Sequence, residues 1–98
     1  MKLSIKWNRR ALKQLDDLIA YIEEDSPYNA EKVRNDILLK INALLERPES
    51  YKPDKYKINN DSTFRAFEIH HHRISYRYKG SDIRIIRIRH SKMNPLEY

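Results

Sequence analysis

The side chains best suited to chemistry gather in the last third of the chain. Residues 62–98 hold eight lysines and arginines against three acids, a net charge of +5, whereas residues 1–61 hold twelve against eleven, or +1. All four histidines lie in the same part, at His70–His72 and at His90. Cations concentrated beside histidine and tyrosine favour a surface that meets phosphate.

Cleavage of RNA is the reaction that these residue types suit best. It needs a base to activate the 2′-hydroxyl, a cation to stabilise the charged phosphorane and an acid for the leaving oxygen. Because the 2′-hydroxyl is itself the nucleophile, no metal ion is needed. The cations and proton carriers of the right kind are Arg65, Arg73, Arg87, Arg89, Lys92, His90 and Tyr98. The competing interpretation is structural, since strand arginines are often only solvated and His90 shares a predicted strand face with Ile86 and Ile88.

Metal and cofactor sites find little support in the sequence. His70, His71 and His72 are adjacent, and neighbouring residues of a strand point to opposite faces, so the three cannot converge on one ion. The chain has no cysteine, which excludes thiolate sites and disulfides. Gly80 is the only glycine, which excludes a glycine-rich phosphate loop. We expect no metal and no cofactor.

Length and composition predict a single domain over residues 1–98. Hydrophobic residues make up 40% of the chain, enough for one modest core. No apolar run approaches the roughly 20 residues that a membrane-spanning helix needs. The N-terminal sequence MKLSIKWNRR lacks the apolar stretch of a signal peptide. The sequence therefore predicts a cytoplasmic protein without a membrane partner, whose net charge of +6 favours an anionic one.

Apolar spacing predicts a strand and two helices in the first half. Lys2–Trp7 alternates apolar and polar residues with the period of a half-buried strand. Arg9–Glu24 places its apolar residues three and four apart, on one face of an amphipathic helix. A second helix, with Ser26 as N-cap and Pro27 at its first position, ends near residues 47–48. Because the turn between the helices is short, we expect an antiparallel hairpin.

The second half predicts a loop followed by three strands. Residues 49–61 have the composition of a loop, with room for a short strand around residues 56–58. The predicted strands are residues 64–70, 73–79 and 83–90. Together these elements predict an α+β fold of order β-α-α-β-β-β. The helical hairpin would pack on one face of a small, mostly antiparallel sheet, and the other face would be left to the arginines.

Two details of the predicted strands bear on where the arginines point. Residues 73–79 alternate cleanly, with Arg73, Ser75, Arg77 and Lys79 on one face. The last strand changes phase at Ile85-Ile86 (residues 85–86), which indicates a bulge or a strand covered on both faces. Gly80-Ser81 (residues 80–81) suits a tight hairpin, and the three histidines are expected to form a turn or bulge.

Taken in order, several short motifs resemble the RelE/ParE superfamily of type II toxin–antitoxin toxins over essentially the whole chain. They are ALKQLDDLIAYI at residues 11–22, the helix end before residues 47–48, Phe64-Arg65, HRISY at residues 72–76 and IRHSKMNP at residues 88–95. Each motif alone is loose, but their order and spacing are fairly specific for the superfamily. The resemblance implies a growth-inhibiting toxin that a cognate antitoxin holds inactive.

Toxins of the RelE-like branch cut mRNA on the ribosome. The resemblance of this chain to that branch implies roles for particular residues. It implies a metal-independent mRNA endoribonuclease that uses basic residues on the sheet and a C-terminal tyrosine or histidine. Phe67 departs from the pattern, because some RelE-like toxins carry a lysine there. The candidate catalytic residues are Arg65, Arg73, His90, Lys92 and Tyr98, and the candidate nucleic-acid contacts are Arg77, Arg87 and Arg89.

The ParE-like branch binds DNA gyrase and stalls it after cleavage, with no enzymatic site of its own. Its members have a longer helical hairpin, which the predicted helices over residues 9–46 resemble. A histidine such as His90 at the end of the last strand occurs in both branches. The sequence therefore leaves gyrase inhibition and mRNA cleavage open. A non-toxic RNA- or ribosome-binding module of the same fold is the alternative from a different class.

Overall fold

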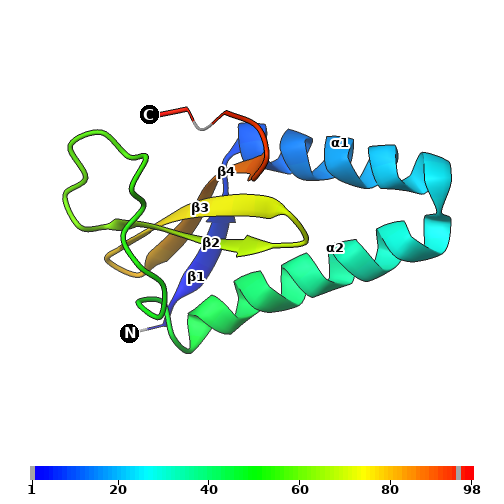
Figure 1. Ribbon diagram of the computed structural model, residues 1–98. Coiled ribbons are helices and arrows are strands. Elements are labelled where there is room, and N and C mark those ends of the chain that lie inside the picture. The colour runs from blue at the N-terminus through cyan, green and yellow to red at the C-terminus, as the bar shows by residue number, and fades with distance from the viewer. Residues whose placement is uncertain (1, 95) are drawn as a thin grey trace.

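The computed structural model describes residues 2–94 and 96–98 and has the predicted α+β order, β-α-α-β-β-β (Figure 1). Its elements are β1 (Ser4–Trp7), α1 (Arg9–Asp25), α2 (Pro27–Asn42), the 3-10 turn η1 (Ala43–Leu45), β2 (Phe64–Ile69), β3 (His72–Lys79) and β4 (Asp82–His90). The second helix therefore ends slightly earlier than predicted, in a tighter final turn. None of the described helices has the length and apolar character needed to cross a bilayer.

The four strands form one sheet in the order β1-β4-β3-β2. The consecutive strands β2, β3 and β4 pair antiparallel, and β1 joins the edge parallel to β4. A parallel neighbour requires a crossover connection, and the helical hairpin supplies it. The prediction of a mostly antiparallel sheet with a helical hairpin on one face is confirmed.

The two helices pack on the sheet through the apolar stripes that the sequence predicted. Ala11 and Leu15 of α1 and Val33 and Ile37 of α2 are buried in the same core cluster as the strand residues. The Ser26 side chain accepts a hydrogen bond from the Asn29 amide at 3.1 Å and so caps α2 as expected. Figure 1 shows the turn of this hairpin at one end of the molecule and the long loop before β2 at the other.

A bulge in β4 sorts its side chains between the two faces of the sheet. Ser75 pairs with Arg87, but the next residue of β3, Tyr76, pairs with Ile85, so Ile86 is the extra residue. Side chains alternate between the two faces of a strand. Without the extra residue, the isoleucines on one side of the bulge would face away from the helices, and the arginines there would face the core. The bulge therefore places the arginines of β3 and β4 together on the face away from the helices.

That second face is not left to the arginines, and this expectation was wrong. The loop before β2 and the C-terminal segment lie over it. The Asp54 amide donates to the Phe64 carbonyl at 2.9 Å, the Tyr98 amide to the Tyr56 carbonyl at 3.0 Å, and the Ile58 amide to the Tyr98 carbonyl at 2.6 Å. Residues 56–58 form turns rather than the short strand considered above, because their backbone groups bond to the C-terminal segment instead of to the sheet.

The turn between β2 and β3 carries backbone strain. His70 and His71 have φ angles of 49° and 63°, the left-handed region that a two-residue turn of this kind requires at both positions. The His70 ring contacts the Asp36 carboxylate of α2 at 2.7 Å, and the Ser91 amide donates to the His71 carbonyl at 2.7 Å. The predicted histidine turn is thus confirmed, and its neighbours hold it in place.

We expect His71→Gly to stabilise the fold by about 0.5–1 kcal/mol, because relief of the left-handed strain exceeds the added entropy of the unfolded chain. Denaturant unfolding measures the difference. His71→Ala is the matched control, since it removes the same ring but keeps Cβ and the strain. Equal unfolding free energies for the two variants would contradict this account of the turn.

Candidate functional site

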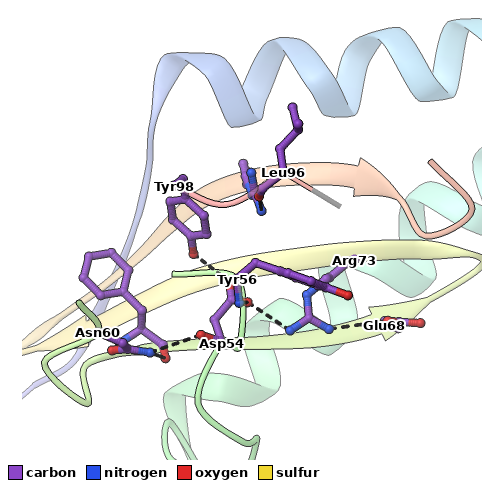
Figure 2. A network of polar contacts seen from close by, with 9 residues as sticks. Asp54, Tyr56, Asn60, Glu68, Arg73, Leu96 and Tyr98 are labelled. Atoms are coloured by element: carbon purple, nitrogen blue, oxygen red, sulfur yellow. Dashed lines mark hydrogen bonds and ion pairs between the residues drawn. The ribbon is translucent and has the colours of Figure 1, made fainter. Parts of the chain in front are cut away.

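The polar centre of the second sheet face is one carboxylate, that of Asp54. This residue is 2% exposed although it lies in the loop before β2. Its oxygens accept hydrogen bonds from the Tyr98 hydroxyl at 2.6 Å, the Arg73 guanidinium at 3.0 Å and the Tyr56 amide at 3.1 Å. Figure 2 shows Asp54 between Arg73 on the sheet and Tyr98 in the C-terminal segment. A buried carboxylate is stable only when it is paired and hydrogen-bonded, as it is here.

The loop is shaped to present this carboxylate. The Asn60 side-chain amide donates to the carbonyls of Phe64, at 2.9 Å, and of Asp54, at 3.3 Å. Its Oδ1 accepts from the amides of Ser62 and Phe64. One asparagine side chain therefore closes the loop onto the start of β2 and satisfies backbone groups that the turns leave unpaired.

The charge state of the centre follows from its contacts. Burial raises the pKa of the Asp54 carboxyl, but the hydrogen bonds from Tyr98 and Arg73 outweigh it and hold that pKa below its ordinary value. Burial and the bond to Asp54 both raise the pKa of the Tyr98 hydroxyl far above its usual range. At neutral pH Asp54 is therefore ionised, and the protonated Tyr98 hydroxyl donates a hydrogen bond to that carboxylate.

Arg73 is committed to contacts within the protein. Its guanidinium pairs with Asp54 and, at 3.4 Å, with Glu68 on the neighbouring strand. It also lies over the Tyr56 ring, 5.0 Å from the centroid. The Arg73 side chain is only 18% exposed. Cation–ring and carboxylate contacts together fix the guanidinium plane.

Arg87 and Tyr98 form a second contact between the sheet and the C-terminal segment. The Arg87 guanidinium lies 4.0 Å from the centroid of the Tyr98 ring and donates to the Leu96 carbonyl at 2.5 Å. Arg87 is 8% exposed, and burial lowers its pKa. The Phe64 ring meets the Tyr98 ring edge-on, with centroids 6.1 Å apart. Tyr98 is therefore held through its ring as well as its hydroxyl.

The structure brings some of the predicted site residues together and separates others. Arg73, Arg87 and Tyr98 meet at the Asp54 centre. Arg65 pairs with Tyr76 in the sheet register, which turns it toward the helix side, where its guanidinium donates to the Tyr51 carbonyl at 2.6 Å. Arg65 thus lies on the opposite face of the sheet from Arg73.

His90 and Lys92 lie at the end of β4, beside the centre rather than in it. His90 is half-buried, and its Nδ1 accepts the Lys92 amide at 3.1 Å. The His72 ring lies 5.0 Å from the His90 ring, centroid to centroid. The Lys92 side chain is exposed in the turn that follows. Among the described residues, no group of three or more histidines and carboxylates is arranged to hold a metal ion.

The remaining predicted nucleic-acid contacts, Arg77 and Arg89, also have partners inside the protein. Arg77 pairs with the Asp61 carboxylate at 3.1 Å and lies over the Phe64 ring, 4.7 Å from its centroid. Arg89 donates to the Asn94 carbonyl at 3.2 Å. The basic face is therefore largely occupied by the loop and the C-terminal segment.

This arrangement suits holding a structure better than moving protons. The Tyr98 hydroxyl has given its hydrogen bond to a buried anion, and its raised pKa opposes ionisation to a base at neutral pH. Arg73 is neutralised by two carboxylates. In this conformation Arg73, Arg87 and Tyr98 are turned toward each other and toward Asp54, not toward solvent.

Sequence reasoning missed Asp54, Asn60 and Ser75. Asp54 is the one acid in the run Lys52-Pro-Asp-Lys-Tyr-Lys57, whose composition indicates an exposed loop. Ser75 was visible only as a polar residue between arginines on one strand face. The loop composition did not indicate a buried anion, because the burial of Asp54 depends on Tyr98, 44 residues away in the sequence.

We expect Asp54→Asn to destabilise the fold by about 3 kcal/mol, since it leaves the Arg73 guanidinium partly buried without its main counter-charge. Denaturant unfolding at neutral pH measures this loss. Asp17→Asn is the matched control, because Asp17 pairs only with exposed Lys13 at the surface and should change stability little. Similar stabilities for both variants would contradict a structural role for the buried pair.

The same carboxyl predicts a pH dependence. The folded pKa of Asp54 lies below the ordinary value of 3.8, so its contribution is fully present above that value and is lost as pH falls through the folded pKa. Unfolding free energies measured from pH 7 to pH 2 should therefore fall on acidification, less steeply below pH 4 in Asp54→Asn than in the parent chain. Parallel curves for the two proteins would exclude Asp54 as a source of the acid sensitivity.

Three comparisons with known proteins agree with this architecture. A family model described as "ParE toxin of type II toxin-antitoxin system, parDE" matches residues 5–95. "Putative toxin Y4kP" of Sinorhizobium fredii (strain NBRC 101917 / NGR234) is 43% identical over 53 residues, which are 54% of this chain and 55% of that protein. The chain thus matches about half the length of that curated relative.

A solved structure described as "Chromosomal ParDE TA system from P. aeruginosa" has the same fold. Its TM-score is 0.72 at 23% sequence identity, over 93% of this chain and 98% of that chain. At this identity the likeness speaks for the fold alone. The family model, however, matches nearly the whole sequence, including both helices and the strands β2 to β4. The chain therefore belongs to the family of ParE toxins of type II toxin–antitoxin systems.

Proposed function

We propose that this protein is the growth-inhibiting toxin of a two-gene module, that a cognate antitoxin neutralises it in the cytoplasm, and that its target is DNA gyrase. Membership of the ParE family supports the toxin and antitoxin parts. Gyrase is the target that the resemblance to the ParE-like branch implies. The proposal sets aside ribosome-dependent mRNA cleavage, the activity of the RelE-like branch.

The observation that carries the choice of target is the occupied Asp54 centre. A nuclease of the RelE kind needs free cations and a proton carrier on the sheet face that meets RNA. Here the Tyr98 hydroxyl bonds to Asp54 and the Arg73 guanidinium pairs with Asp54 and Glu68. Arg65 lies on the other face of the sheet. These contacts favour a toxin that acts by binding a protein target rather than by cleaving RNA.

The helical hairpin offers the antitoxin an apolar surface. Tyr21 at 78%, Tyr28 at 81% and Leu39 at 68% are the most exposed large hydrophobic residues on the two helices. The chain carries a net charge of +6. An acidic, partly disordered antitoxin that lays a helical or extended segment across the helices and the basic sheet would match both properties.

Two measurements distinguish gyrase from the ribosome as the target: an assay of gyrase supercoiling and the mapping of mRNA ends in cells. With the purified chain and gyrase, we expect loss of ATP-dependent supercoiling and an increase in gyrase-linked DNA breaks. In cells that express the chain, mRNA should keep intact ends and the SOS response should be induced. Codon-phased mRNA cuts with normal supercoiling would overturn the choice of gyrase. Unimpaired growth in every strain tested would favour the non-toxic binding module.

Tyr98→Phe sharpens this test, because it removes one oxygen and keeps the ring beneath Arg87. If Tyr98 acted in proton transfer, mRNA cleavage and growth inhibition should fall by about 100-fold or more. For a toxin that binds gyrase, we expect growth inhibition to remain within a few-fold of the parent chain. Tyr28→Phe, which removes a hydroxyl from an exposed residue of α2, is the matched control.

A further inference from the structure

A small cavity lies on the second sheet face, between β3, β4 and the segments that cover them. Its volume is about 50 Å³, and Ser75, Arg73, Arg87, Arg89 and His90 contribute to its lining. A cavity of this size exceeds the space for one water molecule and is far too small for a nucleotide. It suits one small polyatomic ion.

Two buried polar atoms in the lining have no partner among the residues that the structure describes. They are the Arg73 Nε and the Ser75 Oγ. Ser75 lies close enough to Asp54 to contribute to the lowered pKa of that carboxyl, yet its hydroxyl makes no hydrogen bond of ordinary geometry. Because unpaired buried groups cost free energy, they indicate a missing partner that can accept from both an N–H and an O–H.

The charge of the lining points to an anion. Arg73 has carboxylate partners in Asp54 and, at the rim, Glu68. Arg87 and Arg89 bond only to backbone carbonyls and, for Arg87, to an aromatic ring, and neither forms an ion pair with a described residue. Arg87 is 8% exposed. Of the described carboxylates, only that of Asp54 acts on the Arg87 guanidinium, and it does so from a distance. A buried guanidinium without a directly paired counter-charge is unfavourable, so an anion in the cavity would supply one.

His90 adds a donor to the same lining. Its Nδ1 accepts the Lys92 amide hydrogen, which can only be donated, so the neutral ring carries its own hydrogen on Nε2. The lining residues therefore carry hydrogen-bond donors of three kinds, in guanidinium, hydroxyl and imidazole groups. A tetrahedral oxyanion accepts several hydrogen bonds at once, which a halide does less well.

We propose that this cavity binds one small tetrahedral oxyanion, with inorganic phosphate as its physiological form. The bound anion would neutralise Arg87 and Arg89 and complete the hydrogen bonds of Arg73 and Ser75. It would thereby hold the C-terminal segment against the sheet. This site is independent of the gyrase proposal, since it concerns the folded chain alone.

Thermal unfolding of the isolated chain, made by cell-free synthesis, tests the site. At constant ionic strength, replacing chloride with about 20 mM phosphate should raise Tm by about 4 °C in a saturable manner, the effect of a ligand at several times its Kd on a domain of this size. Sulfate should give a similar shift. Equal Tm in phosphate and chloride would overturn the proposal.

Matched variants locate the site. Ser75→Ala should fold, because it removes only a hydroxyl that makes no hydrogen bond of ordinary geometry, and should weaken phosphate binding measured by titration calorimetry at least fivefold. Arg89→Ala provides the same readout through a second lining residue. Arg84→Ala is the control, since Arg84 lies outside the cavity and bonds to Asn8, and it should keep the phosphate response. Unchanged binding in both lining variants would overturn the site.

A final comparison distinguishes a site for free phosphate from a site for nucleic acid. A ten-nucleotide RNA or DNA at the same phosphate concentration should produce no shift that depends on Ser75, because a cavity of about 50 Å³ is too small to admit a nucleotide. If the oligonucleotide gave such a shift and inorganic phosphate gave none, the site would be a nucleic-acid surface and the proposal would be wrong.

Discussion

The closed face of this sheet depends on one buried ion pair and the hydroxyl that joins it. Asp54 reaches the sheet from a long loop, Arg73 meets it from β3 at 3.0 Å, and Tyr98 meets it from the C-terminal segment at 2.6 Å. Three parts of the chain that are far apart in sequence therefore share a single carboxylate. Removing the carboxylate leaves the Arg73 guanidinium and the Tyr98 hydroxyl buried without their shared partner, so both contacts depend on it.

Because of this dependence, the net charge of the sequence does not indicate what the protein binds. The sequence shows a basic last third, and a basic sheet face suggests contact with nucleic acid. In the folded chain Arg73 pairs with Asp54 and Glu68, and Arg77 pairs with Asp61. A charge that is neutralised within the protein contributes little to attraction outside it. The gyrase proposal follows because arginines that are paired within the protein are not available to bind or cleave RNA.

Local patterns predicted the fold well because local physics determines these elements. Ser26 and Pro27 marked the start of α2, and the phase change at residues 85–86 marked the bulge in β4. The alternation in β3 placed Arg73 and Ser75 on one face, as the register confirms. In each case a few neighbouring residues carried all the information.

The site was predicted only in part because it depends on contacts between distant segments. No local rule indicates that Asp54, among lysines, is buried, or that Tyr98 covers the sheet. Arg65 was grouped with Arg73 by position, but their places in the pleat put them on opposite faces. Spacing identifies the face of a residue reliably only once the register of its strand is known.

The central claim is that the C-terminal segment is held on the sheet by the Asp54 centre. Native-state hydrogen exchange of the Ile58 and Tyr98 amides, which bond to the Tyr98 and Tyr56 carbonyls, tests it most directly. We expect both amides to be protected at neutral pH and to lose protection together in Tyr98→Phe. Exchange of either amide in the parent chain at the rate of an unstructured peptide would contradict it.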